Sequence, residues 1–220
     1  MTKLVNTEKN FLVFFFLNSV NIKIIIPIFP LSGIIFFPHT NLPLNIFEPR
    51  YIAMVDYALN SNSNIGMIQP QENGALYSIG CMGKITSCKK TSDGGYLINL
   101  MGQDCFKLKN EVELKKKFRL AEIKTYSNLS KKEGLDLKNL KTLELLREYE
   151  KFMADRGLGI NLNYFKKVGK TNIIKFIAMT TSFSSAEKQM LLEAVSVKEL
   201  FKKLVTLLQY YNLAVSSSIN

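Results

Sequence analysis

The sequence predicts an α+β protein in which a small, partly closed β-barrel precedes an α-helical part. Residues 22–126 contain short β-branched and aromatic runs separated by glycine-containing turns, whereas residues 135–213 carry apolar residues at helical spacing. The polar segment Ser127–Gly134 between them is typical of a linker. With 220 residues, 47% of them hydrophobic, the chain can bury a sizeable core, and general disorder is excluded.

Residues 1–21 form an N-terminal extension that we expect to lie outside the core fold. Its apolar run Phe11–Leu17 follows a weakly charged start, but no small-residue cleavage site follows the run. An export signal, a short surface anchor and a start codon assigned too early all stay open as alternatives. The longest apolar stretch, Phe11–Ile28, is interrupted by polar residues, so the sequence predicts no complete transmembrane helix and no stable membrane insertion.

Extended segments are expected first along the chain. Ile22–Phe29 is rich in β-branched and aromatic residues, which suits a strand. Pro27 and Pro30 favour an edge position or a turn, because proline cannot donate a hydrogen bond to a sheet. A second apolar run, Ile34–Phe37, and another extended segment, Leu42–Phe47, follow.

The first helix is expected to begin at Glu48-Pro49-Arg50. Proline fits the first helical position, and a glutamate is favourable near the positive end of the helix dipole. One face then carries apolar residues at the spacing i, i+3, i+4, i+7 and i+8, which are Tyr51, Met54, Val55, Ala58 and Leu59. The segment Asn60–Asn64 consists of poor helix formers and ends this helix.

More strands follow, separated by turn signals. The expected strands are Ile65–Gln69, Ser78–Ser87, Tyr96–Met101 and Arg119–Tyr126. The expected turns are Asn73-Gly74, Asp93-Gly94-Gly95 and Gly102-Gln103-Asp104.

The second part is helical. Its first helix is marked by Leu137, Leu140, Leu143, Leu146, Tyr149 and Met153, and it stops before Gly157. A second helix is expected over Thr171–Thr181, with Ile173, Ile174, Ile177 and Ala178 on one face. Two capping boxes, Ser184 with Glu187 and Ser196 with Glu199, precede two further helices. The last helix has an apolar face of Val197, Leu200, Phe201, Leu204, Leu207, Leu208 and Tyr211.

The formal net charge of +11 is uneven. Residues 1–110 hold 9 basic and 6 acidic side chains (+3), and residues 111–220 hold 20 and 12 (+8). A basic half can follow a phosphate backbone or an anionic surface. Lysines beside glutamates at helical spacing equally indicate ordinary solvated helix faces, and we favour this interpretation.

Residues that carry catalytic chemistry are scarce. His39 is the only histidine, and Cys81, Cys88 and Cys105 lack metal-binding spacing, so we expect no metal site. Their odd number suits a reducing compartment, and we expect a cytoplasmic location. Gly169-Lys170-Thr171 matches the end of a phosphate-binding loop, but Tyr164 stands where that motif needs glycine. We therefore expect no catalytic residues and no cofactor.

Several motifs in order resemble the Lon substrate-binding domain, the N-terminal domain of the ATP-dependent Lon protease, and in particular its short stand-alone bacterial members. They are Pro27-Ile-Phe-Pro-Leu-Ser-Gly33, Pro43-Leu-Asn-Ile-Phe-Glu-Pro-Arg-Tyr51, Ile65-Gly66-Met67, Gly80-Cys-Met-Gly83, Leu100-Met-Gly102 and Ser185-Ala-Glu-Lys-Gln-Met-Leu-Leu-Glu193. The similarity covers about Ile26 to Leu208. Two departures are the N-terminal extension and Cys105, which stands where an arginine of a strand-end ion pair is common.

The resemblance implies a PUA-like barrel followed by a helical bundle. It also implies a non-catalytic protein of protein quality control that binds unfolded or tagged polypeptides, with a protease or chaperone as a further partner. The ATPase and Ser–Lys protease domains have no counterpart in these residues. Candidate peptide contacts are Phe37, Phe47, Arg50 and Tyr51, although a structural role for Phe47, Glu48, Arg50 and Tyr51 at the start of the helix is favoured.

Two other functions stay open. RNA binding is the main alternative, suggested by the PUA-like barrel and the basic second half. An uncharacterised enzyme is disfavoured by the scarcity of histidine and nucleophile motifs. The natural partner and the oligomeric state do not follow from the sequence.

Overall fold

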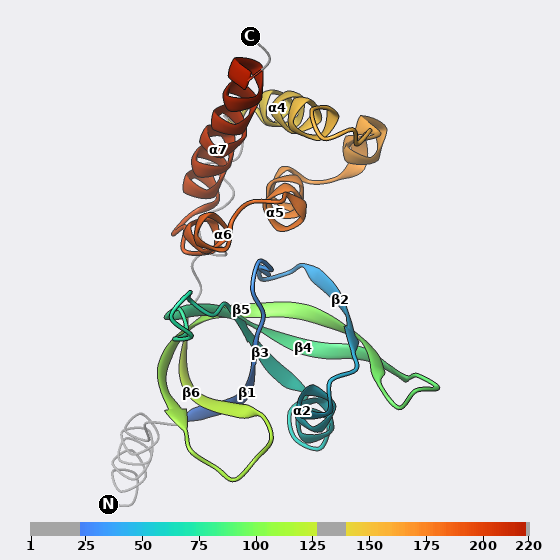
Figure 1. The fold of residues 1–220 in the computed structure, drawn as a ribbon, viewed down its shortest axis with the longest axis vertical. Helices are drawn as coiled ribbons and strands as arrows, with labels where there is room; N and C mark the ends of the chain where they lie inside the picture. The colour runs from blue at the N-terminus through green and yellow to red at the C-terminus, as the bar shows by residue number, and fades with distance from the viewer. Residues whose placement is uncertain (1–22, 127–139, 219–220) are drawn as a thin grey trace, which may run out of the picture.

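The structure, a computed structural model, describes residues 23–126 and 140–218. The expected extension, residues 1–21, and the expected linker Ser127–Gly134 lie outside the described residues. Figure 1 shows a ring of strands with a group of helices above it.

Six strands form one mixed sheet: β1 (Ile24–Pro30), β2 (Asn41–Ile46), β3 (Asn64–Ile68), β4 (Ile79–Lys90), β5 (Tyr96–Val112) and β6 (Arg119–Tyr126). Their order is β2-β5-β4-β3-β1-β6, and an additional pairing of β5 with β6 links five of them into a ring. Strand β2 extends the sheet from β5 (Figure 1). The α+β class, with a partly ringed sheet and a helical C-terminal part, is confirmed.

Strand β5 is far longer than the predicted Tyr96–Met101, because it pairs with different strands along its length. Its first part pairs with β2, Cys105–Val112 pairs with β6, and β4 runs beside both parts. The predicted turn at Gly102-Gln103-Asp104 is wrong. Met82 pairs with Asp104 and Gly83 with Gly102, so Gln103 is the extra residue of a β-bulge.

Strand β1 lies inside the sheet, so the expected edge position is wrong. Its two neighbouring ladders overlap only at Ile28, since β6 pairs with Ile24–Ile28 and β3 with Ile28–Pro30. Pro27 therefore has a partner only on β6 and Pro30 only on β3. Each proline occupies a place where one side of the strand needs no donor.

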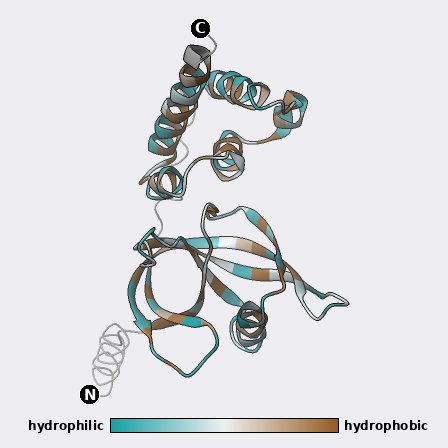
Figure 2. Ribbon diagram, viewed as in Figure 1, coloured by the Kyte–Doolittle hydropathy of each residue, from teal (hydrophilic) through white to brown (hydrophobic). Residues whose placement is uncertain are grey.

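Apolar side chains fill the ring, and hydrophobic and hydrophilic residues alternate along its strands (Figure 2). The buried cluster consists of Ile26, Ile28, Ile68, Met82, Phe106, Ala121 and Ile123. Phe106 is fully buried at its centre, and a Cβ atom at Gly80 would lie 2.5 Å from the Phe106 ring. Glycine at position 80 therefore permits the close packing of this aromatic residue.

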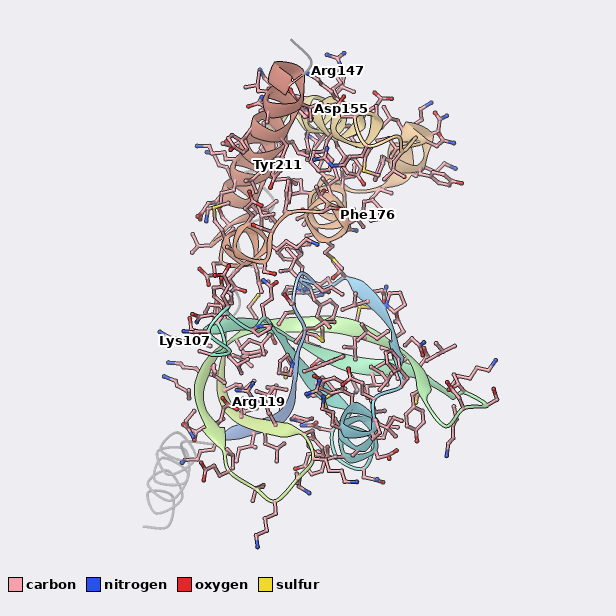
Figure 3. All side chains as sticks on the ribbon, viewed as in Figure 1. Lys107, Arg119, Arg147, Asp155, Phe176 and Tyr211 are labelled. Carbon is pink, nitrogen blue, oxygen red and sulfur yellow. The ribbon has the colours of Figure 1, made fainter. Side chains whose placement is uncertain are left out.

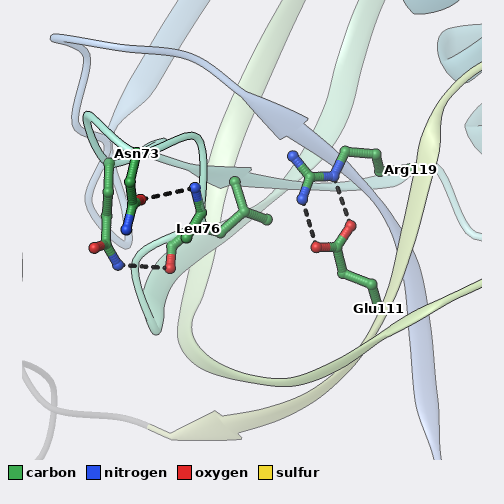
Figure 4. Close-up of polar contacts among 6 residues, drawn as sticks. Asn73, Leu76, Glu111 and Arg119 are labelled. Atoms are coloured by element: carbon green, nitrogen blue, oxygen red, sulfur yellow. Dashed lines mark hydrogen bonds and ion pairs between the residues drawn. The ribbon is translucent and has the colours of Figure 1, made fainter.

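Figure 4 shows two polar features of the barrel. Arg119 on β6 binds both carboxylate oxygens of Glu111 on β5, with 2.6 Å between Nε and Oε2. This bidentate pair ties together the two strands that close the ring. At the predicted turn Asn73-Gly74, the Asn73 side-chain oxygen accepts from the backbone N–H of Ala75 at 3.0 Å, and Gly74 has a φ of 82°.

Helix α2 (Pro49–Leu59) begins as predicted, with Glu48 as the N-cap and Pro49 as its first residue. It lies on the side of the strands away from the other helices (Figure 1). Of the expected apolar face, Tyr51, Met54, Val55 and Ala58 are buried. Leu59 is 40% exposed, because eight residues place it about 80° from Tyr51 around the helix. The apolar run Ile34–Phe37 lies in a loop rather than a strand.

The C-terminal part consists of α4 (Thr142–Ala154), the 3-10 helix η1 (Leu162–Lys167), α5 (Lys170–Thr180), α6 (Ser185–Leu192) and α7 (Val197–Ser218). The expected apolar face of α5 is buried. The expected face of α4 is partly wrong: Leu145, Tyr149 and Phe152 are buried, whereas Leu143 is 59% exposed. Residues spaced only by three drift around a helix of 3.6 residues per turn. The buried residues of α4 are instead spaced by four and then three positions.

The two capping boxes differ. The first is confirmed: the Ser184 hydroxyl accepts from the Glu187 N–H, and the Glu187 carboxylate accepts from the Ser184 N–H. At the second, the Ser196 hydroxyl accepts from the Glu199 N–H at 3.1 Å, but the Glu199 carboxylate accepts from Val195 rather than from Ser196.

Buried contacts join the helices to the barrel. Gln69, after β3, donates to the Ser185 carbonyl and to the Gln189 side chain at 3.0 and 3.1 Å, and Gln189 donates to the Ile79 carbonyl. Lys188 donates to the Gly33 carbonyl at 2.7 Å. One continuous apolar cluster also contains residues of both parts. This shared core fixes α5 and α6 on the barrel. The division into subdomains at 22–126 and 135–213 stays a prediction.

Candidate functional site

Helix α5 lies between two apolar hollows. The first, of about 700 Å³, is bounded by α4, η1 and α5. Most of its lining is aromatic or aliphatic: Tyr149, Met153, Ile160, Tyr164, Phe165, Val168 and Phe176. Tyr164 is 78% exposed and Phe176 is 45% exposed, so large apolar surface here faces solvent.

The second hollow, of about 440 Å³, lies between one side of α5 and residues 34–43 of the barrel. Its apolar lining is Ile34, Ile35, Leu42, Pro43, Phe176 and Met179. Asn172 and Phe176 line both hollows, so the two hollows adjoin along α5 with these side chains between them. Figure 3 shows Phe176 on the side of α5 away from α7. We call this feature the α5 groove.

The lining of the α5 groove is nearly free of charge. No aspartate, glutamate, lysine or arginine lines either hollow, and the polar groups are amides, hydroxyls and His39. Phe165 and Phe176 pack edge to face, with ring centroids 5.6 Å apart. An apolar lining with a few polar groups suits the side chains and backbone of a peptide.

A third hollow, of about 840 Å³, has a mixed polar and apolar lining and lies where α6 begins. Ser32, Tyr77, Ser184 and Ser185 line it together with the chain around Glu72. Ser184 is occupied in the capping box described above. Its lining is much more polar than that of either hollow beside α5.

The four predicted peptide contacts do not form one surface. Phe37 is fully buried, so its side chain packs in the core. Tyr51 is 9% exposed and packs on Phe29, with ring centroids 4.3 Å apart. Arg50 lies over the Tyr51 ring at 4.4 Å and pairs with Glu48 at 2.8 Å. These contacts agree with a structural role at the start of α2, and peptide contact by any of the four stays untested.

Phe47 differs, because 66% of its side chain is exposed. It directly follows β2, whereas the α5 groove uses the beginning of that strand at Leu42 and Pro43. Phe47, Arg50 and Tyr51 therefore lie at the other end of β2 from the groove, whereas the buried Phe37 precedes the strand. One residue of the groove could be singled out from the sequence. Phe176 is aromatic but lies outside the buried apolar face of its helix.

Cys81, His39 and Lys170 belong to the residue types that could carry chemistry, and the structure shows the surroundings of each. Burial raises the pKa of the Cys81 thiol well above its usual value, so the reactive thiolate is disfavoured. His39 is exposed in a loop with a φ of 62°. Lys170, of the loop-like Gly-Lys-Thr sequence, donates to the Leu140 carbonyl at 3.1 Å. Among residues 23–126 and 140–218, no three histidine, cysteine or acidic residues are placed to share a metal ion.

A helix must be both long and apolar to cross a membrane. None of the described helices combines the length and the apolar character needed to cross a bilayer.

Comparison with known proteins gives consistent matches. The family model described as the ATP-dependent protease La (LON) substrate-binding domain matches residues 25–210. Lon protease 1 of Borreliella burgdorferi is 27% identical in an alignment of 191 residues that covers 78% of this chain and 24% of that protein. Lon protease 2 of Myxococcus xanthus is 27% identical in an alignment of 203 residues that covers 87% of this chain and 24% of that protein. The chain thus spans about a quarter of the length of these relatives.

Solved structures show the same fold. The N-terminal domain of the Mycobacterium avium complex Lon protease aligns with a TM-score of 0.62 at 17% identity, covering 84% of this chain and 98% of that one. The Lon N-terminal domain protein from Xanthomonas campestris aligns with a TM-score of 0.56 at 18% identity, covering 83% and 98%.

Proposed function

Because the chain belongs to the family of ATP-dependent protease La (LON) substrate-binding domains, we propose that it binds unfolded or tagged polypeptides as a non-catalytic adaptor of protein quality control. The relatives are full-length Lon proteases, and this chain corresponds to about a quarter of their length. Binding without ATP or peptide hydrolysis is therefore the activity that we assign to these residues. We also assign the ring of strands to the PUA-like class and the protein to the cytoplasm.

The α5 groove is the observation that carries this proposal. Unfolded chains expose apolar side chains that folded proteins bury, and they are captured by apolar surface that is open to solvent. The groove supplies such surface on a rigid support, since Ile173, Ile174 and Ile177 on the opposite side of α5 are buried in the shared core. A rigid groove lowers the entropic cost of binding, because its own side chains lose little freedom.

RNA binding has less support. Aromatic and basic residues do come together on the barrel, where Lys116 lies 4.8 Å from the Tyr57 ring centroid and 5.9 Å from that of Phe118. The lysine therefore covers aromatic faces on which bases would stack. RNA binding stays the alternative function. For the polypeptide adaptor, we expect a protease or a chaperone as a further partner.

The proposal is tested with one client protein in two states. We expect the purified full-length chain to bind a reduced, alkylated client, measured by fluorescence anisotropy, and to leave the same client unbound when its disulfides are intact and it is folded. The matched pair has the same sequence, apart from the alkylated cysteines, so a difference reports exposed apolar surface. Equal binding of both states, or of neither, would refute polypeptide capture.

A further inference from the structure

Two of the three segments that wall the α5 groove carry no acidic residue, whereas the third, α4, does. Residues 156–186, which include η1 and α5, contain Arg156, Lys166, Lys167, Lys170 and Lys175, and no aspartate or glutamate. The barrel wall, residues 31–47, contains no aspartate, glutamate, lysine or arginine. The groove therefore has an apolar floor between a barrel wall without charge and a basic segment that contains η1 and α5.

Lys166 and Lys167 are free to meet a ligand, whereas Lys170 and Lys175 are engaged within the protein. Lys170 donates to the Leu140 carbonyl, and Lys175 is buried with its ammonium group donating to the Pro38 carbonyl at 3.1 Å. Lys166 and Lys167 are exposed at the end of η1, directly after the groove residue Phe165. Among the described residues, no hydrogen bond or ion pair engages either of these two ammonium groups.

Acidic residues near the groove come from α4. This helix contributes Tyr149 and Met153 to the lining; it also carries Glu144, Glu148 and Glu150, and Asp155 follows its last residue. Glu148 accepts a hydrogen bond from Asn212 of α7 at 2.8 Å, so it is turned to the other side of the helix. In the described part of the chain, none of these carboxylates forms an ion pair with Lys166 or Lys167.

We propose that the α5 groove selects extended segments in which aromatic or aliphatic residues are flanked by aspartate or glutamate. The apolar residues occupy the two hollows on either side of Phe176, and the acidic flank meets Lys166 and Lys167. The inference rests on the proposed function, and it adds a site and a sequence preference to it. Charge complementarity of this kind distinguishes between ligands more than it raises affinity for all of them.

The size of the preference follows from exposed ion pairs. One such pair changes affinity by a modest factor, and two together give about a 2- to 30-fold preference for an acidic over an uncharged flank at low salt. Basic flanks should bind more weakly than uncharged ones, because like charges then meet. The preference should shrink as salt is added, whereas the apolar contribution of Phe176 should persist.

The test uses the full-length chain and three labelled peptides with the same aromatic core and with acidic, uncharged or basic flanks. Binding is followed by fluorescence anisotropy. We expect the order acidic, uncharged, basic for the unchanged protein, and the reverse order for the double variant Lys166→Glu/Lys167→Glu. Phe176→Ser should weaken all three by at least about tenfold, which corresponds to the loss of one anchoring aromatic residue.

Phe47→Ser is the matched control, because it removes an even more exposed phenylalanine outside the groove. It should bind all three peptides like the unchanged protein, and circular dichroism melting should verify that each variant is folded. Binding that is lost in Phe47→Ser, that is unaffected by Phe176→Ser, or that has no flank preference would overturn the groove proposal. If the unfolded client still binds in that case, the proposed function survives; if neither client nor peptides bind, both fail.

Discussion

The packing of Gly80 against Phe106 gives a direct test of the ring. A Cβ atom at position 80 would lie 2.4 Å from the Met67 carbonyl oxygen and 2.5 Å from Cζ of Phe106, about 1 Å closer than ordinary van der Waals contact. Neither neighbour can yield freely, because Met67 is paired with Cys81 in the sheet and Phe106 fills the ring. Overpacking of a rigid core costs about 1–3 kcal/mol, so we expect Gly80→Ala to destabilise the protein by that amount.

The matched control is Gly159→Ala. This glycine lies in a loop, and no atom lies within 4 Å of the position its Cβ would take. Its substitution should leave the midpoint of thermal unfolding unchanged or slightly higher, since alanine restricts the unfolded chain. Thermal melting followed by far-UV circular dichroism should show Gly80→Ala melting about 2–12 °C below the unchanged protein. Equal melting temperatures for the two variants would refute the packing of the ring described above.

Three further predictions follow from the structure and the sequence. Burial raises the pKa of Glu187, but hydrogen bonds from Ser184 and Tyr211 outweigh it and hold that pKa below the ordinary 4.5. Its contribution to stability is therefore complete above about pH 4.5 and lost as the pH falls through the lower folded-state pKa, so Glu187→Gln should flatten the pH dependence of the melting temperature there. Highly purified protein should hydrolyse neither ATP nor peptides, and turnover abolished by a single substitution would contradict this. Deletion of residues 1–21 should leave thermal melting nearly unchanged, and a large loss would place Phe11–Leu17 in the core.

Features that depend on neighbouring residues were predictable from the sequence. Strand β6 and helix α5 were expected almost at their observed bounds, and the Ser184 capping box forms as expected. In each case, periodicity or a fixed spacing of side chains carries the information. The family resemblance then placed these elements in one fold, which the matches to Lon N-terminal domains support.

Features that depend on distant residues were not predictable in this way. The sequence of Gly102-Gln103-Asp104 suits a turn, but the pairing with β4 on one side makes it a bulge in a long strand. The place of β1 inside the sheet depends on where two other strands begin and end.

The α5 groove illustrates the same limit for the site. Its walls come from residues 34–43 and 149–180, which only the docking of the helices on the barrel brings together. The predicted contacts instead followed the motif around Phe47, Arg50 and Tyr51. A motif indicates what a family shares, and part of this one packs α2 on the barrel.

The most direct test of polypeptide capture compares the salt dependence of two ligands. We expect the affinity for a reduced, alkylated client to change little between 50 and 200 mM salt, because apolar contacts release few counterions. Binding to RNA should be weak and steep, since about six phosphate contacts cost roughly a thousandfold in affinity over the same range. Tight RNA binding that persists at 200 mM salt, together with client binding that collapses, would contradict the central claim.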